Sequence, residues 1–168
     1  MTEQPPLVEF ERWETPFEFS DTVIFDVQYG NGGFYLYLAE GQKLWDLAPS
    51  NEKNYDSLTI RLFCPDDQTV YRIEFDQIGA HRVLDEGGLL QLWSSDERRK
   101  IRNKSDKPPM TFRVRGHGWS EESPVSFIHS TTDGWSFVIS SSITCVEVLS
   151  FNPPEIIAEQ KLSPQRPS

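Results

Sequence analysis

Apolar and polar residues alternate along much of this chain with the two-residue period of β-strands. The run 22–29 (TVIFDVQY) places Val23, Phe25 and Val27 on one predicted face and Asp26 on the other. A Gly/Asn cluster at 30–33 follows, and the β-rich run 34–38 (FYLYL) comes next. Two such runs around glycines are typical of a hairpin.

A second hairpin is predicted from residues 58–64 and 70–75, which flank the sequence Pro65-Asp66-Asp67-Gln68. Proline fixes φ and aspartate bonds the local backbone, so this sequence favours a turn. Further strands are expected at 80–84, 89–93, 110–115, 134–140 and 143–150.

About nine or ten short strands with regular turn signals predict a mainly β fold, an antiparallel sandwich or a barrel-like single domain. Helices are expected at Ser95–Arg102, where Ser95 is a candidate cap, and as a short turn at Glu155–Lys161 after two prolines. The predicted domain covers residues 7–161, and the polar, proline-containing ends 1–6 and 162–168 are expected to be disordered tails.

Composition supports a packed core, because 12% of the 168 residues are aromatic. The first residues lack a basic segment followed by an apolar run, and no apolar run reaches membrane-spanning length. Cys64 and Cys145, the two cysteines, lie in strand-like runs and are interpreted as reduced core residues. These features predict a cytoplasmic protein without a membrane partner.

Charge is distributed unevenly along the chain. Residues 98–115 contain eight of the 16 Lys and Arg residues and one acid, Asp106, a formal +7. Because the whole chain carries −10, the remainder carries −17. An acidic body favours a basic macromolecular partner and repels phosphates. Phe112 is the one aromatic residue in the basic segment, too few for stacking on bases, so nucleic-acid binding is not expected.

No constellation predicts catalysis, a cofactor or a metal. The glycines at 30–33 precede a β-rich run rather than a helix, unlike a phosphate-binding loop. His81, His117 and His129 lie far apart and lack the compact spacing of zinc ligands. The chain is therefore expected not to be an enzyme, although the paired carboxylates and His81 leave that class open.

Two of the five tryptophans are candidate interface residues. Trp45 and Trp119 lie among polar and glycine residues, where a half-exposed ring can serve as an anchor, with edge packing as the alternative. Trp93 and Trp135 lie in strand patterns and are expected in the core.

Two stretches carry a resemblance, Tyr71–Trp93 (YRIEFDQIGAHRVLDEGGLLQLW) and the segment from Trp135 to Pro154 (WSFVISSSITCVEVLSFNPP). They resemble small bacterial immunity proteins of polymorphic toxin and contact-dependent inhibition systems, over about a quarter of the chain. The resemblance implies a bacterial cytosolic protein that binds and neutralises a cognate toxin domain. It transfers no binding residue.

The leading hypothesis is therefore a non-catalytic binding protein with a basic toxin domain as partner, its oligomeric state open. The alternative is a small-molecule-binding β-barrel, suggested by strands rich in aromatic residues. Acidic loops on a sheet scaffold are the expected contact surface. The predicted partner-binding residues are Asp85 and Glu86, Glu121 and Glu122, and Trp119 as the preferred aromatic anchor.

Overall fold

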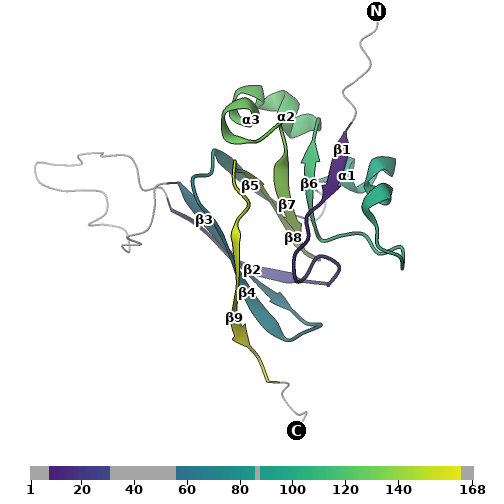
Figure 1. Cartoon of the computed structure of the whole chain (residues 1–168), viewed down its shortest axis with the longest axis vertical. Coiled ribbons are helices and arrows are strands. Elements are labelled where there is room, and N and C mark those ends of the chain that lie inside the picture. The colour runs from purple at the N-terminus through teal and green to yellow at the C-terminus, as the bar shows by residue number, and fades with distance from the viewer. Residues whose placement is uncertain (1–7, 31–55, 86–87, 164–168) are drawn as a thin grey trace, which may run out of the picture.

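The computed structural model describes residues 8–30, 56–85 and 88–163, and these residues form two antiparallel sheets and short helices (Figure 1). The five-stranded sheet has the order β1-β6-β7-β8-β5, and the four-stranded sheet has the order β2-β3-β4-β9. The strands are β1 (Glu9–Arg12), β2 (Val23–Gly30), β3 (Ser57–Cys64), β4 (Thr69–Phe75), β5 (Ala80–Asp85), β6 (Thr111–Arg115), β7 (Ser136–Ser140), β8 (Thr144–Leu149) and β9 (Glu155–Lys161). The helices are α1 (Leu90–Trp93), the 3-10 helix η2 (Asp96–Ile101), α2 (Gly118–Glu122) and α3 (Pro124–Ser130).

The hairpin of β3 and β4 forms as its sequence predicts. Alternate residues of β3 are buried, and Leu58 pairs with Phe75 while Cys64 pairs with Thr69. The turn is stabilised by Asp67, which accepts hydrogen bonds from the backbone N–H of Thr69 and from the Tyr71 hydroxyl. The alternating pattern therefore fixes which face of this hairpin enters the core.

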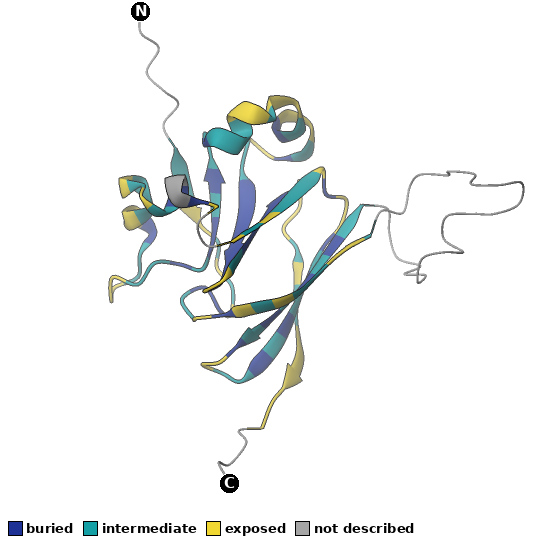
Figure 2. Ribbon diagram, turned by 180° about the vertical axis from the view of Figure 1, so that it is seen from behind, coloured by how far each residue is buried: buried dark blue, intermediate teal, exposed yellow. Residues whose placement is uncertain are grey.

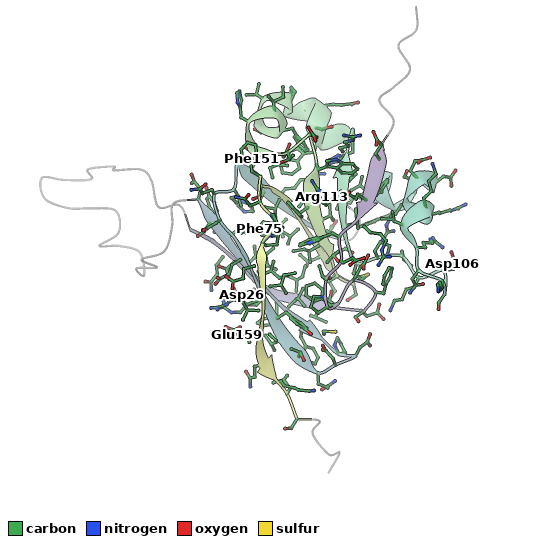
Figure 3. The ribbon with its side chains drawn as sticks, in the orientation of Figure 1. Asp26, Phe75, Asp106, Arg113, Phe151 and Glu159 are labelled. Carbon is green, nitrogen blue, oxygen red and sulfur yellow. The ribbon has the colours of Figure 1, made fainter. Side chains whose placement is uncertain are left out.

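The main core lies between the two sheets, which confirms the mainly β, sandwich-like class. It joins side chains of β3 and β4, such as Ile60 and Phe75, to side chains of β7 and β8, such as Ile139 and Val148. Figure 3 shows Phe75 near the centre of the molecule. Cys64 lies in this core and Cys145 in a second cluster; both are buried and they form no disulfide with each other.

The second core cluster covers the other face of the five-stranded sheet. Leu92 of α1 and Ile101 of η2 pack there against Phe112 and Val138. Helices α2 and α3 lie together at the upper ends of β6 and β7, with α1 beside β1 (Figure 1). Exposed residues lie on α2, α3 and η2, and also along β9 and the edge strand β2 (Figure 2). The helices therefore occupy the face of the five-stranded sheet that the sandwich leaves open.

Two predictions of secondary structure are wrong, and a third has the right position but a different helix type. Most of the predicted strand 89–93 is the short helix α1, and Leu92 of this helix and Leu89 just before it are buried against the sheet. The predicted helical turn Glu155–Lys161 is strand β9, which pairs with the free edge of β4. The predicted helix Ser95–Arg102 is the 3-10 helix η2, and Ser95 precedes it without a side-chain capping bond.

The predicted faces of β2 are also partly wrong, because the strand contains a bulge between Ile24 and Asp26. Ile24 and Val27 pack against the core, whereas Val23 and Phe25 are exposed. A bulge adds one residue to one strand and so changes which side chains face inward.

Several predicted features lie outside the described residues: the run 34–38, Trp45, Glu86 and residues 1–6. Within the predicted C-terminal tail, Leu162 is described and donates its N–H to the Gln68 carbonyl.

Candidate functional site

A buried ion pair joins the two strands at one edge of the five-stranded sheet. Arg82 of β5 lies opposite Glu147 of β8, and its Nε and Nη2 atoms lie 2.8 Å and 2.6 Å from Glu147 Oε2. The Glu147 side chain is 0% exposed and the Arg82 side chain 25% exposed. The carboxylate is therefore removed from water while the guanidinium reaches the surface.

The second oxygen of Glu147 holds two more partners. His117 Nε2 lies 2.7 Å from Oε1, and the Ser136 hydroxyl donates to the same oxygen over 2.5 Å. Burial opposes ionisation of Glu147, but the hydrogen bond and charge of His117, the charge of Arg82 and the Ser136 hydroxyl outweigh it. The pKa of Glu147 is consequently lowered.

His117 enters this network because the chain turns sharply after β6. Gly116 has φ +70°, a conformation that glycine adopts readily, and α2 begins directly after His117. His117 Nδ1 is buried without a hydrogen-bond partner among the described residues. Nε2 is the ring nitrogen that donates to Glu147, because an ionised carboxylate oxygen can only accept.

Trp119 connects this network to the helices. The Arg82 guanidinium lies over its ring, 4.7 Å from the centroid, and Phe127 of α3 packs edge-on at 5.4 Å. Phe127 also packs against His117. Trp119, the predicted anchor, is thus half-buried between sheet and helix, where it positions α2 and α3.

The exposed face of α2 and α3 carries two of the predicted acidic residues and two apolar residues. Glu121 and Glu122 are exposed on α2. Val125 is 65% exposed and Ile128 72% exposed, three residues apart on α3. The sequence prediction missed this apolar pair. A signal was present, since a seven-residue helix with apolar residues at 125, 127 and 128 cannot bury them all on one face.

Asp85 belongs to a different part of the surface. It is exposed at the end of β5 and pairs with Thr144, beside the β7–β8 turn. Trp119 of α2 lies instead over Arg82, three residues earlier on β5. The structure therefore places Glu121 and Glu122 together with Trp119, and Asp85 at another position along the sheet. Glu86 lies outside the described residues.

The basic segment 98–115 pairs largely with acids of the same chain. Arg113 and Arg115 on β6 bind Glu11 and Glu9 on the neighbouring strand β1, with N–O distances of 2.8 Å and 2.9 Å. These pairs follow directly from the register, which sets Glu11 opposite Arg113 and Glu9 opposite Arg115.

Basic residues of the loop between η2 and β6 also form ion pairs with acids of the same chain. Arg102 binds Asp106 at 2.9 Å, and Lys107 lies 3.6 Å from Asp21. Figure 3 shows Asp106 at the outer end of this loop. Arg98 stacks on Trp93, which is half-buried rather than fully in the core as predicted. Burial, together with the charge of Arg102, lowers the pKa of Arg98 to about 10.

Trp135 is also half-buried, and it lies just before β7 rather than within a strand. The guanidinium groups of Arg115 and Arg113 lie 4.7 Å and 5.5 Å from its ring centroid. This tryptophan therefore covers the paired arginines of β6 and is not a fully buried core residue.

Within the described ranges, no group of three His, Cys, Asp or Glu side chains could hold a metal ion. None of the helices in that part of the chain has the length and apolar character that a membrane span requires. Comparison of the sequence with protein-family models and with curated proteins, and of the fold with solved structures, found no match.

Proposed function

We propose that this chain is a non-catalytic binding protein whose partner is a basic protein. In the setting that the sequence resemblance implies, the partner is the cognate toxin domain that an immunity protein neutralises. The proposal rests on charge: the chain carries −10, and most of the basic side chains in its one basic segment are paired with acids of the same chain.

The distribution of the remaining charge supports the same conclusion. Residues 116–160 contain six Asp or Glu residues and no Lys or Arg, although Glu147 is buried against Arg82 and Glu159 binds Arg61. This stretch includes α2 and α3, where Glu121 and Glu122 are exposed. A surface of one sign raises the association rate with a partner of the opposite sign and disfavours partners of the same sign. A basic protein fits it, and a nucleic acid does not.

The packing of the interior does not favour the ligand-binding alternative. A ligand site in a β-sandwich or barrel requires an apolar cavity. Between the two sheets, the described side chains of Phe17, Phe75 and Ile139 are each at most 1% exposed and belong to one continuous cluster.

The test is direct binding to the product of the gene immediately upstream, purified with its own catalytic residues substituted. Titration calorimetry at low and moderate salt should give a stoichiometric complex whose affinity falls as salt rises. The proposal fails if that gene encodes no toxin-like domain and no partner is recovered, or if the purified product does not bind.

A further inference from the structure

We infer that the exposed face of α2 and α3 is the docking surface for this partner, and that Val125 and Ile128 form its apolar centre. The inference rests on the proposed function and assigns the binding surface to a particular part of the molecule. The partner that fits is a basic protein surface with an apolar side chain that packs between these two residues.

Exposure is the first argument. Val125 and Ile128 are more exposed, at 65% and 72%, than most large apolar side chains described in this chain. Phe151, 52% exposed, lies just below α3 in Figure 3, and its carbonyl accepts a bond from Thr132 at the end of that helix. Neighbouring exposed apolar side chains are a recognised feature of protein-interaction sites.

The second argument is that this face is held rigidly. Trp119 is fixed between Arg82 and Phe127, and the Arg82 guanidinium is fixed by buried Glu147. Ser130, the last residue of α3, sits directly against Gly79 before β5, since a Cβ built on Gly79 would lie 1.7 Å from its hydroxyl oxygen. A preorganised surface loses little conformational entropy when a partner binds.

Charge complementarity selects the partner. Glu121 and Glu122 precede the apolar pair in the chain, and Asp133 follows it, all three exposed. Another exposed apolar pair, Val23 and Phe25 on β2, adjoins a surface of mixed charge. There Asp26 and Glu159, which flank one another in Figure 3, both bind Arg61. On α2 and α3, exposed apolar side chains and the exposed carboxylates of Glu121 and Glu122 occur on adjoining helices, a combination that suits a basic partner.

The decisive variant is Val125→Ser with Ile128→Ser, measured against the purified upstream gene product. Because both side chains are exposed, the variant should unfold at the same denaturant concentration as the unaltered chain. Its Kd should rise about tenfold or more, mainly through faster dissociation. The matched control, Val23→Ser with Phe25→Ser, removes an exposed apolar pair on the other sheet and should bind within about twofold of the unaltered chain.

Each other outcome overturns a distinct claim. If the unaltered chain binds and the Val125/Ile128 variant binds equally tightly, the docking surface is wrong while the proposed function stands. If the unaltered chain does not bind, the proposed function fails and the docking surface fails with it. If sedimentation shows a dimer of the unaltered chain that this variant dissociates, the face is a self-association surface and the assignment to a basic partner is overturned.

Discussion

Arg82 and Glu147 are cross-strand neighbours at the edge of the five-stranded sheet, and they form an ion pair whose acidic partner is completely buried. The same guanidinium lies over Trp119 on α2. One residue thus neutralises a buried carboxylate and supports the helices that carry the proposed docking surface. The stability of the sheet edge and the position of α2 are coupled through this side chain.

Substitution of Arg82 by Met should be strongly destabilising. It keeps the apolar stem against Trp119 but leaves Glu147 buried without its guanidinium partner, which costs about 3 kcal/mol or more of the free energy of unfolding. Arg61→Met is the matched control, because its side chain is similarly exposed (26%) but its partners Asp26 and Glu159 are 31% and 34% exposed. Arg61→Met should lower the free energy of unfolding by about 1 kcal/mol or less, because its ion pairs are partly exposed. Urea unfolding measures both, and equal losses would contradict the buried-pair argument.

Lowering the pH should remove the contribution of Glu147. Its pKa in the folded protein lies below the ordinary value of 4.5, because its partners outweigh burial. A group with a lowered pKa stabilises the fold above its unfolded pKa, and this contribution is lost as the pH falls through the folded pKa. The stability difference between the unaltered chain and Glu147→Gln should therefore be large at neutral pH and shrink below pH 4.5.

The control for this experiment is Glu159→Gln, which removes an exposed carboxylate of the four-stranded sheet. Its stability difference from the unaltered chain should be small across the same pH range. A constant difference for Glu147→Gln between neutral and acidic pH would show that the carboxylate is not ionised in the folded protein.

Local sequence patterns predicted those parts of the fold that local chemistry determines. The β3–β4 hairpin follows from alternation and from the Pro65–Gln68 turn, both of which lie within one short stretch. Strand β9 could not be predicted in this way, because the sequence EIIAEQK also suits a helix and only the free edge of β4 makes it a strand. The bulge in β2 likewise depends on its pairing with β3.

The residues of the candidate site likewise fall into two groups, those that local sequence predicts and those that only the fold brings together. Glu121, Glu122 and Trp119 were predicted as partner-binding residues because polar and glycine residues surround them in the sequence, and this assignment stays a prediction. The network of Arg82, Glu147 and His117 was not predicted. Arg82 and His117 lie 65 and 30 residues from Glu147 in the sequence, and only the folded sheet brings the three side chains together. Glu147 lies in a run, CVEVL, whose alternation with buried valines gives no sign that the acid has a partner.

The contact between Gly79 and Ser130 can be tested by a double-mutant cycle. A Cβ at Gly79 would lie 1.7 Å from Ser130 Oγ and 2.0 Å from Ser130 Cβ, but 3.5 Å from its Cα. Gly79→Ala should therefore lower the stability by about 1–3 kcal/mol through overpacking. In a Ser130→Gly background the same substitution should cost much less, because the clashing atoms are absent. Additive effects of the two substitutions would show that Ser130 does not contact Gly79.

Charge reversal separates the two predicted acidic surfaces. Glu121→Lys with Glu122→Lys should slow association with the basic partner and flatten its dependence on salt, because these carboxylates rim the surface on α2 and α3. Dissociation should change less than in the Val125/Ile128 variant, since rim charges steer encounter more than they hold the complex together.

Asp85→Lys is the comparison variant for this experiment, because Asp85 is also exposed but lies beside the β7–β8 turn. A single reversal there should slow association only slightly, through the small change in net charge. Stopped-flow association rates over a salt series decide between the surfaces. A larger effect of Asp85→Lys than of the double reversal on α2 would move the interface to the end of β5 that the sequence also indicated.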